Sequence, residues 1–270
     1  MHRRTWLAAL SGVVLIALGA GTSLAHDFWI QPSAFIAEDE ARVDARLFVG
    51  HGDEINEFPY LSHFIVRLEI HGPDGVAKVK SRNASRPAVR TQLGRAGIYT
   101  VVYQSHHSYV ELEPERFERY LLEEGLTGII EERKRRGEEQ KPGQESFARY
   151  CKALIRVGKG KKDFDRKLGL PLELTAIDNP FAARARGKLR FVLEYRGKAM
   201  ANAHVELISL DDLDDKVSGS TDKRGQVSFK VPHAGRWMVT STHMRRAPSS
   251  VKGDWESFWA NLTFEVPGKK

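Results

Sequence analysis

The 270-residue sequence predicts a mainly β protein, built from two antiparallel β-sandwich modules joined by a short α-helical segment. Three observations lead to this fold class. Apolar and polar residues alternate along two separate stretches, 67–105 and 204–242. Gly, Pro and Asp residues bound the alternating runs, as is typical of antiparallel strands. Between the two stretches the apolar spacing changes to three or four residues, which indicates helices.

The two alternating stretches share one layout. In the first, "RLEIHGPDGV" is followed by an Ala-Gly pair and "IYTVVY"; in the second, "HVELISLDD" and the turn "TDKRG" are followed by an Ala-Gly pair and "RWMVTS". Several short strands within about 90 residues favour a β-sandwich. We therefore expect an N-terminal β-sandwich over residues 26–112 and a C-terminal β-sandwich over residues 168–270.

Residues 113–167 are expected to form a helical connector. The segment "EPERFERYLLEEGL" (113–126) has Pro114 at a first-turn position, apolar residues at helical spacing and a glycine near its end. The segment "ESFARYCKALIRVG" (145–158) has apolar residues at the same spacing, so a further helix is expected there.

The first 25 residues are expected to be a cleaved export signal. They combine a basic start, an apolar run, and small residues, Ser23 and Ala25, at the positions that signal peptidase requires. The apolar run is shorter than the roughly 20 residues of a membrane span, and no later segment is long enough to cross a bilayer. Cleavage after Ala25 would make His26 the first residue of a periplasmic protein. The sequence leaves the general secretory and twin-arginine routes open.

The charge pattern and the single cysteine argue against a nucleic-acid-binding protein and against an internal disulfide. The formal net charge is +7, and two units of it belong to arginines of the signal. Basic residues are interleaved with acidic ones, as in "EERKRRGEEQK" (131–141), which favours a solvated helix face over a nucleic-acid surface. The single cysteine, Cys151, cannot form an internal disulfide and is expected to be a small buried residue.

The sequence contains none of the common catalytic motifs. Cys-x-x-Cys, His-Glu-x-x-His, Gly-x-Ser-x-Gly and a phosphate-binding glycine loop are all missing from the 270 residues. We therefore expect a protein that is not an enzyme. The groups that could bind a ligand are imidazoles, carboxylates and the amine that signal cleavage would create.

A chain that begins with histidine can chelate a metal ion. The α-amino group and the imidazole of His26 would supply two nitrogen donors from one residue, and a further imidazole would complete a set suited to Cu(II) or Ni(II). The α-amino group has a pKa of about 8, so a metal ion displaces its proton easily near neutrality. The alternative is that cleavage leaves a histidine there by chance.

His51 and His243 are the other predicted metal ligands. His51 lies between two glycines in "FVGHGDE", at the end of an apolar run, where a tight loop would present its ring. His243 ends "RWMVTSTHM" on the face of the strand that carries Trp237. Because the two come from different modules, an ion held by His26, His51 and His243 would lie at the module interface, where ligand sites are common. A turn histidine and a histidine at the rim of the core are the respective alternatives.

The remaining histidines and the C-terminal tryptophans are weaker candidates. His106 and His107 are adjacent in an expected strand, so only one of them could point toward a shared site. Trp255 and Trp259 share one face of the last strand and are expected to pack in the core, with a ligand-stacking role as the alternative.

Segments spread along the chain resemble one family. "AHDFWIQPSAF", "FVGHGDE", "ELEPERFERYLLEEGL" and "STDKRGQVSFKVPHAGRWMVTSTHM" are together similar to the DUF4198 family of exported bacterial proteins, often labelled nickel-uptake substrate-specific components. The resemblance implies a role with nickel or cobalt and supports His26, His51 and His243 as metal ligands. The second module also resembles immunoglobulin-like or transthyretin-like units, which commonly bind and do not catalyse.

The sequence thus favours a periplasmic metal-binding protein that buffers nickel, cobalt or copper or delivers it to a membrane uptake system. Its partners would be the metal ion and a membrane metal transporter, with no nucleic acid involved. A β-sandwich module for adhesion or scaffolding, binding protein or polysaccharide, is the alternative. An oxidative copper enzyme that uses the terminal histidine is a third hypothesis.

Overall fold

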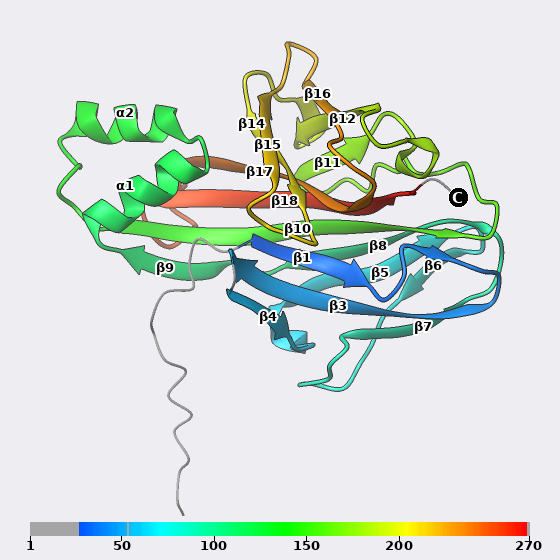
Figure 1. Ribbon diagram of the computed structural model, residues 1–270. Helices are drawn as coiled ribbons and strands as arrows, with labels where there is room; N and C mark the ends of the chain where they lie inside the picture. The colour runs from blue at the N-terminus through cyan, green and yellow to red at the C-terminus, as the bar shows by residue number, and fades with distance from the viewer. Residues whose placement is uncertain (1–26, 53, 269–270) are drawn as a thin grey trace, which may run out of the picture.

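The computed structural model describes residues 27–52 and 54–268, without the side chain of His51. The chain forms three stacked β-sheets, with two helices beside one end of the central sheet (Figure 1). The predicted mainly β class with sandwich packing is confirmed, and the central sheet belongs to both sandwiches.

The first outer sheet has four strands, and its inner face packs against the central sheet. Phe28, Ile30 and Leu47 from this sheet contact Val101 and Ile155 of the central sheet in one apolar core. The strands are β1 (Asp27–Pro32), β3 (Ala41–His51), β4 (Glu54–Phe58) and β7 (Val89–Leu93), and η1 (Ser62–Phe64) follows β4.

The central sheet has ten strands and runs through the whole molecule. Its main path is β15 (Lys216–Ser220), β14 (His204–Ser209), β17 (Gly235–Arg246), β18 (Trp255–Val266), β10 (Gly143–Val157), β8 (Gly97–Ser105), β5 (Ile65–Gly72) and β6 (Gly75–Lys78), and β2 (Ile36–Ala37) and β9 (Ser108–Leu112) also pair with β10. Most pairs are antiparallel as expected, but β10 pairs in parallel with β18 and β2.

The second outer sheet has four strands and covers the other face of the central sheet. Phe191 and Phe229 from this sheet pack against Trp237 and Phe264 of the central sheet in a second apolar core. The strands are β11 (Leu172–Ala176), β12 (Lys188–Tyr195), β13 (Lys198–Ala199) and β16 (Gln226–Lys230), and η2 (Pro180–Ala182) lies between β11 and β12.

The prediction of a helix over residues 145–158 is wrong, because this segment forms the 15-residue strand β10. Nearly every residue of β10 is buried, since outer layers cover both of its faces. A strand buried on both faces shows no two-residue alternation, so its apolar residues fell on helical spacing. β10 pairs with β8 of the first module and β18 of the second, and thereby joins the two modules.

The helical segment consists of two helices, α1 (Pro114–Glu123) and α2 (Thr127–Arg136). Pro114 occupies the first turn of α1 as predicted, and Phe117 and Tyr120 pack on the central sheet. Trp255 and Trp259 are 0% and 7% exposed in the same core, so their predicted burial is confirmed. No helix in the described part of the chain has the length and apolar character that crossing a membrane requires.

A candidate cation site at the module junction

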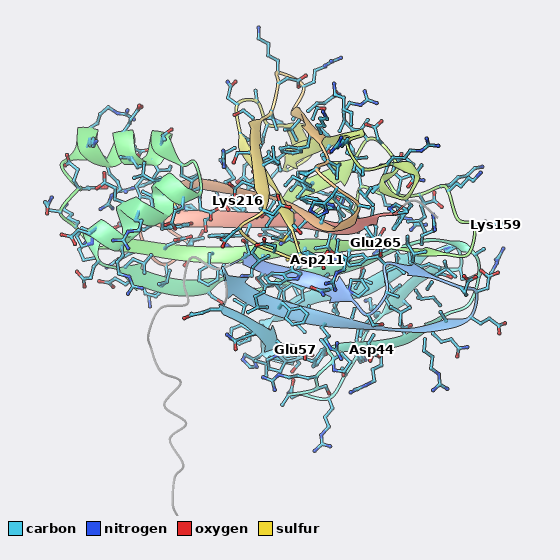
Figure 2. All side chains as sticks on the ribbon, viewed as in Figure 1. Asp44, Glu57, Lys159, Asp211, Lys216 and Glu265 are labelled. Atoms are coloured by element: carbon cyan, nitrogen blue, oxygen red, sulfur yellow. The ribbon has the colours of Figure 1, made fainter. Side chains whose placement is uncertain are left out.

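A cavity of 270 Å³ lies where β1 begins, between the two modules and the end of α1. Its wall is strongly acidic, with five carboxylate residues and one lysine, Lys216, which projects from the β15 end of the central sheet (Figure 2). The lining residues are Asp27, Gly52, Glu123, Glu124, Glu206, Ile208, Leu213, Asp214 and Lys216.

Backbone pairing places Asp27 at this wall. Asp27 pairs with Gly50 of β3. The backbone of Glu54 passes so close to Gly50 that a Cβ at this glycine would lie 2.6 Å from the carbonyl oxygen of Glu54. The central sheet holds the next residue, because the side chains of Cys151 and Asn261 both donate hydrogen bonds to the carbonyl oxygen of Phe28. The start of β1 therefore has a fixed position on the central sheet.

Glu124 comes to the cavity from the C-terminal end of α1. Gly125, with φ at +67°, ends the helix, and a Cβ at this glycine would lie 2.6 Å from the Cβ of His204. The hydroxyl of Thr242 donates a hydrogen bond of 2.7 Å to Oε2 of Glu124. Burial, followed by the negative charge of Asp27, raises the pKa of Glu124 to about 8. Glu124 therefore carries a proton at neutral pH.

Glu206 of β14 faces the same cavity but is ionised. Burial acts to raise its pKa, but contacts with His204, Lys216 and Ser218 outweigh this effect, so that the pKa of Glu206 lies below its usual value. Its carboxylate lies 3.6 Å from Nε2 of His204 and 3.3 Å from Nζ of Lys216. The cavity therefore places an ionised carboxylate from the second module near a protonated one from α1.

A second buried carboxyl group, that of Glu145, lies under α1. Tyr120 donates a hydrogen bond of 3.1 Å to its Oε1, and Ser257 donates a short one to the same atom. Burial is the main cause that raises the pKa of Glu145 to about 7. Among the described residues, neither Glu124 nor Glu145 forms an ion pair with a basic side chain.

The predicted metal ligands are only partly placed by the structure. His26 and the side chain of His51 lie outside the described residues, although the backbone of His51 ends β3 and pairs with Glu54. The ring of His243 lies 4.5 Å from that of Tyr195 and 6.0 Å from that of Phe258, and burial lowers its pKa.

His243 continues the face of β17 that carries Trp237, as expected. Thr242, its neighbour, reaches Glu124 from the opposite face of the strand. The structure therefore does not bring the ring of His243 to the acidic cavity, and binding of one ion by His26, His51 and His243 stays a prediction.

Glu124 and Glu206 were not among the residues that the sequence indicated, and His204 was only one of its weaker histidine candidates. Within residues 27–52 and 54–268, no group of three or more His, Cys, Asp and Glu side chains is arranged to hold a metal ion.

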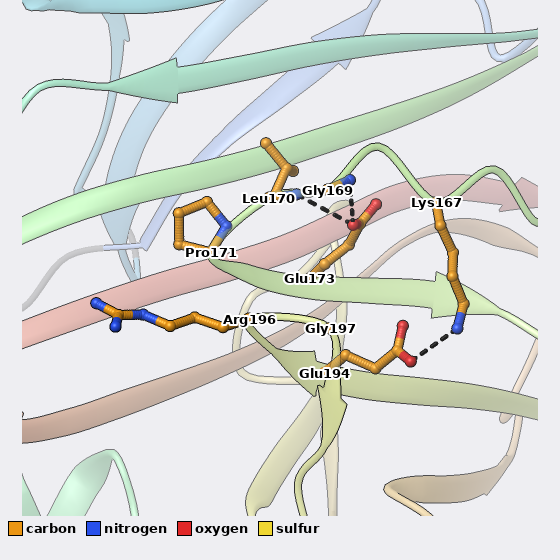
Figure 3. Close-up of a pocket in the computed structure, with 8 residues that line it drawn as sticks. All are labelled: Lys167, Gly169, Leu170, Pro171, Glu173, Glu194, Arg196 and Gly197. Carbon is orange, nitrogen blue, oxygen red and sulfur yellow. Dashed lines mark hydrogen bonds and ion pairs between the residues drawn. The ribbon is translucent and has the colours of Figure 1, made fainter.

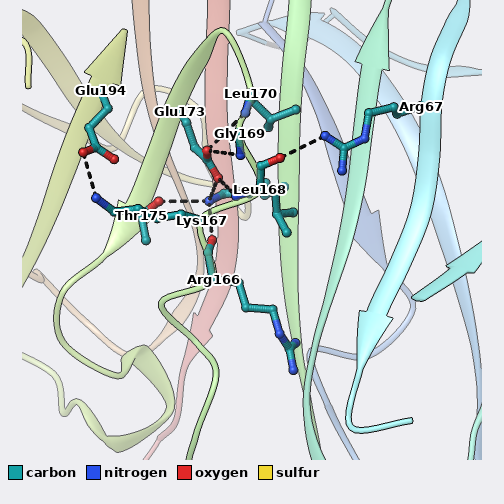
Figure 4. Close-up of polar contacts among 10 residues, drawn as sticks. Arg67, Arg166, Lys167, Leu168, Gly169, Leu170, Glu173, Thr175 and Glu194 are labelled. Atoms are coloured by element: carbon teal, nitrogen blue, oxygen red, sulfur yellow. Dashed lines mark hydrogen bonds and ion pairs between the residues drawn. The ribbon is translucent and has the colours of Figure 1, made fainter. Parts of the chain in front are cut away.

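A larger cavity, of 520 Å³, is lined by the segment that leads into β11 and by the end of β12 (Figure 3). The buried carboxylate of Glu173 borders it and is already fully bound within the protein. Nζ of Lys152 lies 2.9 Å away. The backbone N–H groups of residues 168–170 donate three more hydrogen bonds (Figure 4). This arrangement ties the modules together, and the Glu173 carboxylate is taken up by contacts within the protein.

Comparisons with known proteins identify a family but no activity. No curated protein matches the chain. Similar solved structures include the D0-D1 domain of intimin, at 11% identity over 88% of this chain and 97% of that one, with a TM-score of 0.22. The fibronectin(III)-like modules of Clostridium thermocellum CbhA match at 7% identity over 88% and 94% of the two chains, with a TM-score of 0.21.

TM-scores this low carry no argument about function. The family comparison is different, because the profile described as "Domain of unknown function (DUF4198)" matches residues 23–245, which is most of the chain. The protein belongs to the DUF4198 family.

Proposed function

We propose that the mature protein is an exported binding protein for a divalent transition metal, nickel, cobalt or copper, which it buffers or delivers to a membrane uptake system. One observation carries the proposal: β1 begins at the wall of a cavity with five carboxylate residues. Asp27 lines that wall, so cleavage after Ala25 would create a terminal amine one residue before it in the chain.

The register of β1 and β3 supports a joint role for positions 26 and 51. Asp27 is opposite Gly50 in this register, and the two predicted ligands are the residue before Asp27 and the residue after Gly50 in the chain. Two imidazoles and the α-amine would supply three nitrogen donors to one ion.

The cavity supplies the negative charge that a divalent ion needs. Glu206 is ionised, and an incoming cation would displace the proton of Glu124, because a nearby positive charge favours the ionised form of a carboxyl group. The ion would therefore be exchanged for protons, with tighter binding at higher pH.

Calorimetric titration with Ni²⁺ tests the proposal on protein cleaved to begin at His26. A matched control retains Ala25, which converts the amine into an amide and changes no other residue. We expect the control to bind nickel at least about tenfold more weakly, because it loses one of three nitrogen donors. Equal affinities of the two proteins, or no saturable binding by either, would overturn the proposal.

A further inference from the structure

Arg149 is a half-buried arginine on the face of β10 that is turned toward β1. Its guanidinium carbon lies 4.8 Å from the ring centroid of Phe28 and 5.0 Å from that of Phe147. Its backbone N–H donates to the hydroxyl oxygen of Ser105. The base of the side chain is thus fixed, and aromatic rings hold the guanidinium.

Two other arginines that lie over aromatic rings, Arg245 and Arg246, have an acceptor for their N–H groups, whereas the exposed Arg196 over Tyr195 has none among the described residues. Arg245 lies over Phe258 and pairs with Glu256, and Arg246 lies over Trp255 and pairs with Glu138. Among the described residues, the guanidinium of Arg149 has neither a hydrogen bond nor an ion pair. Stacking uses the faces of the guanidinium, so its in-plane N–H groups are left without a partner among the described residues.

The surroundings of Arg149 favour an anion. Burial lowers the pKa of Arg149, and the nearby Asp27 and Glu145 only partly oppose this effect. Glu145 cannot approach more closely without leaving Tyr120 and Ser257, from which it accepts hydrogen bonds. A half-buried charge without a counter-ion is costly, so an incoming anion would gain more here than at an exposed arginine.

We propose that Arg149 binds a carboxylate group of a small organic acid. The guanidinium fork matches the two oxygens of a carboxylate, which it binds through two parallel hydrogen bonds. The rings of Phe28 and Phe147 beside the fork suit the carbon skeleton of an organic acid better than they suit a fully hydrated inorganic oxyanion.

This site adjoins the proposed metal site. Asp27 is within electrostatic reach of both Arg149 and Glu124. A cation near position 26 would repel the guanidinium unless an anion lay between them. The metal ion therefore binds together with the organic acid, as a complex; this step rests on the proposed function.

Calorimetric titration of the mature protein with citrate, without metal, tests the carboxylate site by itself. We expect Arg149→Met, which still covers the rings, to weaken citrate binding by about tenfold or more. Arg149→Lys should weaken it less, because lysine keeps the positive charge but loses the two parallel hydrogen bonds of the guanidinium. Arg245→Met is the matched control, since it removes another ring-stacked arginine, and it should bind citrate as the wild type does. Circular dichroism shows whether each variant is folded.

Three results would overturn the carboxylate site: no citrate binding by the wild type, equal citrate affinity in folded Arg149→Met, or binding of sulfate as tight as that of citrate. A titration with Ni²⁺ alone keeps the two proposals apart. If the mature protein binds citrate through Arg149 but does not bind Ni²⁺, only the proposed metal function is contradicted. If the mature protein binds Ni²⁺ but its citrate affinity is the same in Arg149→Met, only the carboxylate site is contradicted.

Discussion

Two glutamates at the junctions between the modules, one buried and one half-buried, have opposite surroundings. Glu173, at the start of the second module, accepts hydrogen bonds from three consecutive backbone N–H groups and from Lys152. Glu124, at the end of α1, accepts one from the hydroxyl of Thr242 and lies near other carboxylates. A compensated carboxylate can stabilise a junction, whereas an uncompensated one is available to a cation.

The Glu173 junction also fixes the segment that connects the modules (Figure 4). Arg67 of β5 donates a hydrogen bond to the carbonyl oxygen of Leu168, and Arg166 donates to those of His71 and Ile98. The first module thus holds the connecting segment through the carbonyl oxygen of Leu168 and the side chain of Arg166. The second module holds it through the backbone N–H groups that donate to Glu173. This junction is expected to be rigid.

Removal of Lys152 should give the largest effect on stability. Lys152 and Glu173 are 2% and 4% exposed, so Lys152→Met would leave a buried carboxylate without its cation. We expect the free energy of unfolding to fall by about 3–5 kcal/mol, as for other broken buried ion pairs. Urea unfolding followed by circular dichroism measures the change.

Lys167→Met is the control for this prediction. Lys167 pairs with Glu194 at the same junction, but its side chain is 57% exposed. An exposed ion pair contributes less than about 1 kcal/mol. Similar losses of stability in the two variants would mean that the buried pair has no special role.

Replacement of Glu124 should change how stability depends on pH. In the unfolded chain this carboxyl group has a pKa near 4.5, whereas in the folded protein the value is about 8. Between these values the unfolded chain releases a proton that the folded protein retains, so the free energy of unfolding falls as pH rises from about 4.5 to 8. Its contribution to stability is complete only below pH 4.5.

Glu124→Gln removes this titration. We expect the variant to lose less stability than the wild type between pH 5 and pH 8, by about 1–3 kcal/mol, in urea unfolding at the two pH values. Glu145, with a pKa of about 7, keeps part of the pH dependence. An unchanged pH dependence in the variant would show that Glu124 is already ionised in the folded protein. The same variant should bind nickel more weakly, since it removes a carboxylate from the cavity.

The sequence predicted what local patterns encode. Alternating strands, the start of α1 at Pro114 and the burial of Trp255 and Trp259 all depend on neighbours within a few residues. β10 was mistaken for a helix because its burial on both faces depends on layers from both modules. The parallel pairing of β10 with β18 joins residues more than 100 positions apart and has no local signal.

The candidate site was predicted only in part. Asp27, the second residue expected after cleavage, lines the cavity, and the cleavage itself stays a prediction. Glu124 and His204 look like ordinary polar residues of a helix end and a strand end. They lie together only because α1 folds back onto β14 and β17, which sequence spacing does not reveal.

Loss of the hydrogen bond from Tyr120 to Glu145 should have a moderate effect. Tyr120→Phe keeps the ring stacked on Trp259 but removes a donor from a buried carboxyl group. We expect the free energy of unfolding to fall by about 1 kcal/mol. Tyr109→Phe, which removes an exposed bond to Glu111, is the control and should change stability little. Equal effects would mean that burial does not strengthen the contact with Glu145.

His243→Phe should change stability little and separates the two faces of β17. The ring of His243 already packs against Tyr195 and Phe258, and burial lowers its pKa, so a phenyl ring should fit with a change of less than about 1.5 kcal/mol. Thr242, on the opposite face, reaches Glu124, so nickel affinity should stay unchanged in His243→Phe and fall in Glu124→Gln. The reverse pattern of nickel affinities would restore His243 as the third metal ligand and would place the ion on the Tyr195 face of the sheet, away from the acidic cavity.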